Sequence, residues 1–281
     1  MLQDFNYHNH TYRCGHADDA MIDEDYVKEY IENGFKKMAF TDHMPHEHLV
    51  DPRKGVRMDI SLKDEYLKSI NELKAKYDGI IEVKTGFEVE YLPELEDEIR
   101  RRKDETDILI TGQHFIKDAN GDLKIFGRAP FTRDDYKRYI ECLYNIMSKD
   151  LADIIAHPDF SLMGQGGFSE VEEEMADDLG KLAEEYQVPL EINLNHIFYK
   201  TYFRGRVWNH DDYETQLTRL NEVIYPCRGF WKTISKYDVR VLYGYDIHFG
   251  GQLSKHEEFE KMCAMILGDD VMGSLNFVKE F

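Results

Sequence analysis

Short apolar segments alternate with amphipathic helical segments along most of this 281-residue chain, and this alternation is the strongest constraint on its fold. Seven segments have the length and composition of strands, at 4–11, 37–41, 80–88, 108–111, 152–156, 189–194 and 239–245. Apolar periodicity predicts helices at 22–33, 62–77, 92–102, 134–148, 170–186, 213–223 and 230–236. Strands separated by helices pair in parallel, and such a sheet closes most simply into a barrel. We therefore expect the α/β fold class.

Two stretches interrupt the alternation without marking a domain boundary. The segment 115–132 is an irregular excursion with a turn at 120–122, and the segment 196–209 is aromatic and basic with no clear period. The chain has no internal repeat, no low-complexity run and no linker. A hydrophobic content of 42% is enough for a large core. We therefore expect a single domain over 1–281.

Charge and cysteine content limit the partners and the compartment that we expect. The net charge of -20 argues against nucleic acid or an anionic membrane as a partner, because both attract clustered Lys and Arg. The four cysteines form no CxxC pair, which is typical of reduced thiols. No basic region followed by an apolar one opens the chain, and no run is long enough to span a membrane. We expect a cytoplasmic protein.

Residues that can bind metal ions stand at the carboxyl ends of nearly all the expected strands. His8 and His10 are two apart in an extended strand, so both side chains point to the same face. In a parallel barrel the carboxyl ends of the strands meet at one mouth. The residues placed there are His8, His10, His43, Glu88, His114, His157, Glu191, Asn193, Asp246 and His248. This accumulation predicts a metal site at the carboxyl-terminal ends of the strands.

Several motifs, in one order along the chain, resemble the PHP (polymerase and histidinol phosphatase) superfamily, and more narrowly its histidinol-phosphatase branch. They are His8-Asn9-His10-Thr11, Cys14-Gly15-His16-Ala17, Thr41-Asp42-His43, Gly86-Phe87-Glu88-Val89-Glu90-Tyr91, His114-Phe115, His157, Glu191-Ile192-Asn193 and Asp246-Ile247-His248. The match runs from residue 4 to about residue 250. This resemblance implies a distorted (β/α)7 barrel that holds three divalent metal ions. Mixed imidazole and carboxylate ligands suit zinc, manganese or iron.

The resemblance also implies how the ligands are shared among the three metal ions. The first ion would be bound by His8, His10, Glu88 and Asp246. Glu88 would bridge to the second ion, whose other ligands would be His114 and His157. The third ion would be bound by His16, His43 and His248.

The reaction that this resemblance implies is hydrolysis of a phosphate monoester. The substrate would be a small phosphorylated molecule, most directly L-histidinol phosphate, which gives L-histidinol and phosphate in histidine biosynthesis. Metal-bound hydroxide would attack phosphorus in line while the cations neutralise the phosphoryl oxygens. Asp42 is either the general acid that protonates the leaving alkoxide or a partner that orients a ligand imidazole.

The substrate-binding residues are less clearly marked in the sequence. Contacts to phosphate are expected from Lys200, Arg204 and Arg206 in the loop after the sixth strand, although solvated loop charges explain them equally well. The segments 157–163 and 193–198 lack the basic residues that the branch carries there, whereas 225–226 keeps its Tyr-Pro pair. The histidines expected at the surface or in loops are His46, His48, His210 and His256. The expected packed residues are Cys14, Trp208 and Trp231.

Other functions remain open at this point. The chain could hydrolyse another small phosphate ester or a nucleotide. An amidohydrolase-type enzyme also opens with His-x-His, but the pair Asp246 and His248 favours the PHP pattern. A nuclease of the PHP superfamily conflicts with the acidic charge and with the lack of a basic stripe. A non-catalytic PHP scaffold is the remaining alternative, because such a module can retain metal ligands.

Overall fold

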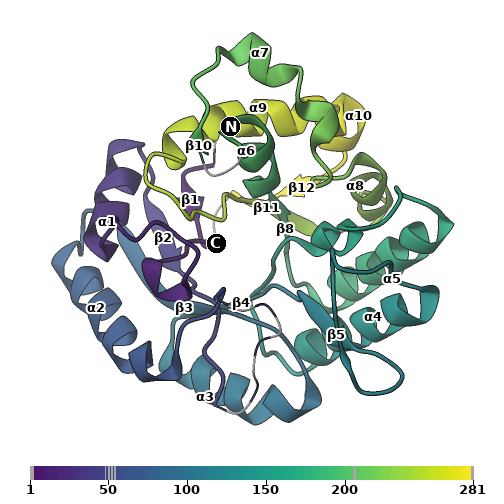
Figure 1. Cartoon of the computed structure of the whole chain (residues 1–281), viewed down its shortest axis with the longest axis horizontal. Helices are drawn as coiled ribbons and strands as arrows, with labels where there is room; N and C mark the ends of the chain where they lie inside the picture. Colours follow the sequence, from purple (N-terminus) through teal and green to yellow (C-terminus); the bar gives the residue numbers. More distant parts are fainter. Residues whose placement is uncertain are drawn as a thin grey trace.

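The computed structural model describes residues 3–47, 49, 51, 53, 55–204 and 207–279. Within these residues, eight strands form one sheet in which every neighbouring pair is parallel. In sheet order they are β1 (Phe5–Asn6), β2 (Lys37–Phe40), β3 (Glu82–Val89), β4 (Ile108–Thr111), β7 (Ile154–Ile155), β8 (Leu190–Asn193), β11 (Arg240–Gly244) and β12 (Asn276–Phe277). Figure 1 shows the strands at the centre with helices around them. The predicted α/β fold class is confirmed.

The sheet curls until β1 meets β11. The side-chain amide of Gln3 donates to the carbonyl of Tyr243 (2.7 Å) and accepts from its N–H (2.9 Å), as a neighbouring strand would. Farther along, the N–H of His10 donates to the carbonyl of Ile247 (2.8 Å), whose N–H donates to the carbonyl of His8 (3.2 Å). The short strand β12, which was not predicted, pairs in parallel with the amino-terminal end of β11. The seven predicted strands thus form the wall of a distorted barrel.

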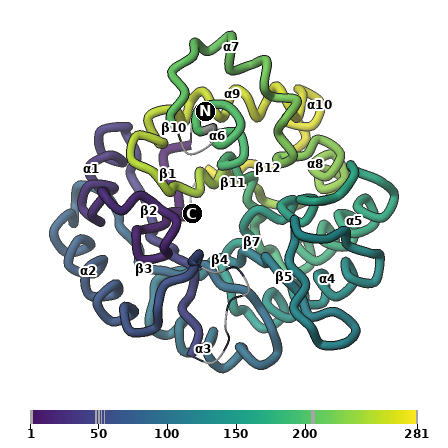
Figure 2. The backbone as a smooth tube through the Cα atoms, viewed as in Figure 1, coloured from purple at the N-terminus to yellow at the C-terminus, as the bar shows by residue number. Residues whose placement is uncertain are grey.

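The longer helices lie outside the strands, as Figures 1 and 2 show. They are α1 (Asp23–Glu32), α2 (Lys63–Lys76), α3 (Glu96–Glu105), α4 (Arg133–Ser148), α5 (Glu170–Tyr186), α8 (Arg228–Ile234) and α9 (His256–Leu267). Local chemistry sets where two of them begin. Thr132 and Asp135 form a capping box at the start of α4, and Ser169 and Glu172 do the same for α5. The predicted helices up to residue 186 all form.

Apolar side chains of the strands alternate between two cores. Ile108 and Ile110 of β4 point into the barrel, whereas Leu109 between them packs with the helices outside. The inner cluster consists of Phe5, Tyr7, Ala39, Ile108, Ile110, Ile154, Ala156 and Leu242. On each strand, these residues come before the polar residues at the carboxyl end. The polar strand ends therefore stand above an apolar barrel interior.

The structure differs from the prediction mainly in the connections. The segment 115–132, predicted as irregular, contains the antiparallel hairpin of β5 (Phe115–Lys117) and β6 (Leu123–Ile125). The predicted helix 213–223 is only α7 (Tyr213–Leu217) and a separate 3-10 turn. Besides β12 and the two hairpin strands, the α-helices and strands that were not predicted are α6 (Asn195–Thr201), β9 (Phe203–Arg204), β10 (Val207–Trp208), α9 and α10 (Asp269–Met272). None of the described helices is long and apolar enough to cross a membrane.

Candidate metal centre

The nine predicted metal ligands gather at the carboxyl ends of the strands. Parallel pairing aligns these ends, and an isolated bridge sets His43 directly beside Glu88. All nine are buried except His16, which is half-buried. A cavity of about 180 Å³ opens among them, lined by every predicted ligand except His8. The other residues that line the cavity are Arg53, Val56, Phe160, Asn195, Tyr199 and Tyr225.

His8, His10 and Asp246 form the first close group of ligand atoms. The Nε2 atoms of His8 and His10 are 3.1 Å apart. Oδ1 of Asp246 lies 3.3 Å from the first of them and 3.2 Å from the second. Oε2 of Glu88 lies 3.6 Å and 3.5 Å from the same two nitrogens. Two nitrogens and two carboxylate oxygens therefore converge on one point.

The carboxylate of Glu88 contacts imidazoles with both of its oxygens. Oε1 lies 2.9 Å from Nε2 of His157 and 3.5 Å from Nε2 of His114. Oε2, which faces the first group, lies 2.9 Å from Nδ1 of His43. A carboxylate that presents each oxygen to a separate set of nitrogens has the geometry that bridges two cations.

His16 and His248 form a third close pair. Their Nε2 atoms are 2.8 Å apart, and the ring of His248 stacks on that of His10 with centroids 4.3 Å apart. The ring of His16 also stacks on that of His43, at a centroid separation of 5.4 Å. His43 consequently lies between the Glu88 carboxylate and the pair of His16 and His248.

The donor set fits divalent metal ions. Among the described residues, the buried atoms His43 Nδ1, Glu88 Oε2 and Asp246 Oδ1 make no hydrogen bond of good geometry, although the first two lie 2.9 Å apart. Each such atom costs about 1–3 kcal/mol when it is left unsatisfied. Cations among these atoms would satisfy them, and mixed nitrogen and carboxylate ligation suits zinc, manganese or iron.

Burial keeps most of these imidazoles in the neutral form that binds metal. It lowers the pKa of His16 to about 3 and that of His248 to about 4. Burial is also the main cause of the lowered pKa values of His10, His43 and His114. The lone pairs of these ring nitrogens are therefore available at neutral pH.

The buried carboxyl groups have the opposite shift. Although burial acts against it, the surrounding histidines hold the pKa values of Glu88 and Asp246 well below the usual range. The same carboxylates overcome burial at His8 and His157 and raise the pKa values of these two histidines. A metal ion that binds there would displace a proton from the histidine.

Glu191 at the end of β8 lies behind the first group. Its Oε2 accepts from Nδ1 of His8 at 2.9 Å, and its Oε1 accepts from the side-chain amide of Asn193 at 2.7 Å. The backbone N–H of His157 also donates to Oε1, at 3.3 Å. These contacts turn Nε2 of His8 toward the first group, as hydrogen bonds to the second ring nitrogen do at metal sites.

Asp42 faces away from the cavity. Its Oδ1 accepts from the N–H of Thr11 (2.6 Å), and its Oδ2 accepts from the Thr11 hydroxyl (2.5 Å). Oδ1 also lies 3.7 Å from Nδ1 of His10. Burial raises the pKa of Asp42 to about 7. The described lining of the cavity does not include Asp42.

A buried network of two arginines and two carboxylates supports the other side of the site. Glu90 accepts from Nδ1 of His114 (2.9 Å), from Nη2 of Arg53 (2.7 Å) and from Nη2 of Arg57 (2.6 Å). Asp51 pairs with both arginines. Sequence reasoning missed this network, because the segment 51–57 has no period and lies outside every motif. Its only visible signal was the pair of arginines in one short loop.

The structure describes the side chain of one of the three predicted substrate-binding residues. Lys200 lies in α6 and is not among the described residues that line the cavity. Arg206 and the side chain of Arg204 lie outside the described residues. From the same segment, the cavity wall receives Asn195 and Tyr199 instead.

Three of the four histidines expected at the surface or in loops lie among the described residues. His46 lies in the loop after β2, but it is buried, and its ring lies 3.9 Å from Glu90 and 3.9 Å from Glu98 because these buried carboxylates attract it inward. His210 is exposed, and His256 is half-buried against Phe35. His48 lies outside the described residues. The residues predicted to be packed are buried or half-buried: Cys14, Trp208 and Trp231.

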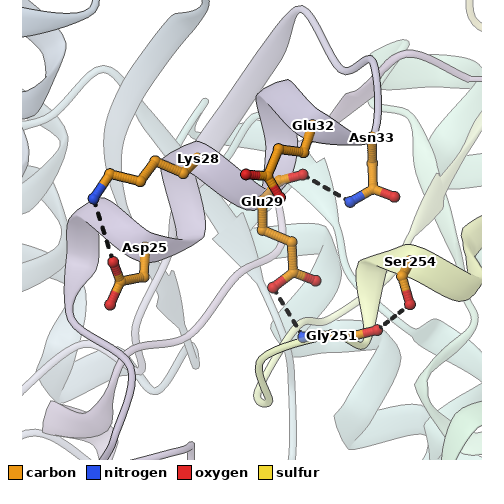
Figure 3. Close-up of a pocket in the computed structure, with 7 residues that line it drawn as sticks. All are labelled: Asp25, Lys28, Glu29, Glu32, Asn33, Gly251 and Ser254. Carbon is orange, nitrogen blue, oxygen red and sulfur yellow. Dashed lines mark hydrogen bonds and ion pairs between the residues drawn. The ribbon is translucent and has the colours of Figure 1, made fainter.

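A second hollow, with a volume of about 400 Å³, lies between α1 and the loop after His248. Figure 3 shows Glu29 reaching from α1 to that loop. Its carboxylate accepts from the N–H of Gly251 (2.9 Å) and from the N–H of Leu253 (3.1 Å). Three of the seven residues around the hollow are acidic, and the contact ties the loop that carries His248 to the outer helix.

Two relatives named as histidinol-phosphatases are similar in sequence to parts of this chain. The histidinol-phosphatase of Bacillus subtilis (strain 168) is 35% identical over 95 residues, which are 33% of this chain and 35% of that protein. A protein named probable histidinol-phosphatase, from Deinococcus radiodurans, is 26% identical over 157 residues, which are 54% of this chain and 59% of that protein. The aligned stretches thus span a third to three fifths of these relatives.

The structural comparison shows the same fold. The histidinol phosphate phosphatase of Lactococcus lactis, solved with zinc, L-histidinol and phosphate, superposes with a TM-score of 0.63 at 15% identity. The superposition covers 95% of this chain and 94% of that one. The family model of the PHP domain matches residues 6–195, which is more than half of the chain. The chain therefore belongs to the PHP domain family.

Proposed function

We propose that this protein is a metal-dependent phosphate-monoester hydrolase whose substrate is L-histidinol phosphate. The observation that carries the proposal is the placement of Glu88, whose two oxygens face separate imidazole groups beside one buried cavity. Two relatives named histidinol-phosphatase support the choice of substrate. The neighbour that holds zinc, L-histidinol and phosphate supports it as well.

We assign the ligands to three cations. The first would be held by His8, His10, Glu88 and Asp246, the second by Glu88, His114 and His157, and the third by His16, His43 and His248. Bound divalent cations would supply an activated water at neutral pH and would neutralise charge on the phosphoryl oxygens. His43 contacts both the Glu88 carboxylate and the ring of His16, so it joins the third group to the other two.

Residues outside the ligand set would hold the ligands in position. Glu191 fixes the ring of His8. We assign Asp42 to the orientation of His10 rather than to proton transfer, because both of its oxygens accept from Thr11. Tyr225 and Phe160, whose ring packs against that of His114, line the cavity and would limit the access of water. The cavity of about 180 Å³ suits a phosphoryl group, with the organic part of the substrate toward the mouth.

A second candidate is hydrolysis of a different small phosphate ester, such as a nucleotide or a sugar phosphate. The observation that favours it is the sequence of segments 157–163 and 193–198, where the histidinol-phosphatase branch carries basic residues and this chain does not.

The experiment that separates the two candidates is a substrate comparison. Purified protein would be reconstituted separately with zinc, manganese and iron and given L-histidinol phosphate, nucleotides and sugar phosphates. A kcat/KM above about 10⁴ M⁻¹s⁻¹ for L-histidinol phosphate, well above all the others, is the expected result. A preference for another ester would keep the chemistry and reassign the substrate. No phosphate release with any metal would contradict the proposal.

A further inference from the structure

Arg53 lines the cavity, although none of the sequence motifs includes it. It belongs to the loop between β2 and α2 and lines the cavity together with eight of the predicted ligands. Among the described lining residues it is the sole Lys or Arg. An anionic phosphoryl group that enters the cavity would therefore meet one fixed positive side chain of the protein.

Hydrogen bonds hold the guanidinium of Arg53 in one orientation. Nε donates to Oδ1 of Asp51 (3.2 Å), and Nη2 donates to Oδ2 of Asp51 (2.9 Å) and to Oε1 of Glu90 (2.7 Å). The planar group also lies over the ring of Phe115, at 5.9 Å from its centroid. The side chain is 14% exposed. Its Nη1 donates to no acceptor among the described residues and is left for a ligand.

The charge of Arg53 reaches the histidines across the cavity. Together with burial, it lowers the pKa of His114, and it contributes to the lowered pKa values of His16 and His43. Arg53 is therefore close to histidines of the second and third groups. An oxygen of a doubly charged phosphoryl group set between these groups would also face the guanidinium, and charge-assisted hydrogen bonds of this kind are strong and directional.

Arg57 belongs to the same network but differs in one decisive respect. Its Nε and Nη2 donate to Asp51, Nη2 also donates to Glu90, and Nη1 donates to the carbonyl of Met44. Each nitrogen of its guanidinium is thus engaged within the protein. Arg57 is also absent from the described lining of the cavity. The two arginines share the Glu90 and Asp51 carboxylates, yet Arg53 alone presents a donor to the cavity.

We infer that Arg53 is the residue that binds the phosphoryl group of the substrate, with Nη1 as the donor. This inference rests on the proposed phosphatase function. The positive charge that the segments 157–163 and 193–198 lack would then come from the loop between β2 and α2. The carboxylates of Asp51 and Glu90 hold the guanidinium in place, so little side-chain freedom is lost when phosphate binds.

The test is binding of inorganic phosphate to the zinc-loaded protein, measured by calorimetry, which requires no turnover. Arg53→Gln is expected to weaken phosphate binding about 10- to 150-fold, the range for hydrogen bonds to charged groups. Arg57→Gln is the matched control and should keep the affinity within about threefold, since its contacts are internal. Arg53→Lys retains the charge and should fall between wild type and Arg53→Gln. Metal content and thermal unfolding are measured for each variant.

Three results would overturn the inference: wild-type phosphate affinity in Arg53→Gln, an equal loss in Arg57→Gln, or no phosphate binding by the wild-type protein. Should Arg53→Gln fail to fold, an affinity of Arg53→Lys equal to that of wild type would also overturn it. Failure of the proposed function is recognised separately, because the wild-type protein would then bind phosphate, with Arg53 required, but release none from any monoester.

Discussion

Gly112, directly after β4, leaves space that the Glu88 carboxylate occupies. A Cβ atom at position 112 would lie 1.7 Å from Oε1 of Glu88 and 2.8 Å from Cε1 of His157. Its backbone is not in the left-handed region, so alanine would add volume without backbone strain. Glu88 would have to move, and its 2.9 Å contact with Nε2 of His157 would be lost. Gly112→Ala should therefore displace Oε1 of Glu88, the oxygen that faces His114 and His157.

We expect Gly112→Ala to lower metal affinity by at least the roughly 10- to 100-fold found when a supporting contact is lost. Forcing extra volume into a packed site should also cost about 1–3 kcal/mol of unfolding free energy. The matched control is Gly180→Ala in α5, where a Cβ would lie 2.3 Å from Tyr237, away from the metal centre. It should lose stability but retain its metal.

The assay is bound metal per chain, measured by mass spectrometry after dialysis against a fixed free zinc concentration, together with thermal unfolding. A Gly112→Ala protein with wild-type metal content and wild-type phosphate release would refute the reasoning, because Glu88 could then move without consequence. Equal metal loss in Gly180→Ala would show that general destabilisation, and not the displaced carboxylate, empties the site.

Three further predictions follow from contacts around the ligands. Glu191→Gln should lower metal affinity roughly 10- to 100-fold by weakening the orientation of His8; the same change at the exposed Glu185 should have no effect, and unchanged zinc affinity in the first variant would contradict the role of Glu191. Asp42→Asn should lower metal content and turnover together, whereas loss of turnover at full metal content would identify Asp42 as a proton donor after all. Chelation should lower the melting temperature by about 5–10 °C, because metal at 100 times its Kd adds about 2.7 kcal/mol of stability. A melting temperature that EDTA leaves unchanged would mean that the folded chain holds no tightly bound metal.

The barrel could be predicted because its strands and helices carry strong local patterns. The strand at 108–111 and the helix at 170–186 form with the predicted bounds, the helix helped by its capping box at Ser169. By contrast, β12 is two residues long and owes its existence to pairing with β11, so no local pattern marks it. The hairpin of β5 and β6 also depends on cross-strand pairing that a turn sequence alone does not specify.

Eight of the nine candidate ligands were visible because barrel geometry places them at strand ends, where polar residues interrupt apolar runs, whereas His16 was predicted only from the resemblance to the PHP motifs. The residues behind them follow a different rule. Arg53 and His46 lie in loops, and each is drawn inward by a buried carboxylate, Glu90 for both. Glu90 is itself satisfied by the arginines and by His114. Such mutual burial depends on how the loop folds over the sheet, which periodicity does not report.

The measurement that most directly tests the account is phosphate release during metal titration of the stripped protein. With L-histidinol phosphate present, activity should be absent without metal and should rise with added zinc, manganese or iron until three ions are bound per chain, as the three ligand groups require. Activity that persists in the stripped protein, or metal-saturated protein that releases no phosphate from any monoester, would contradict it.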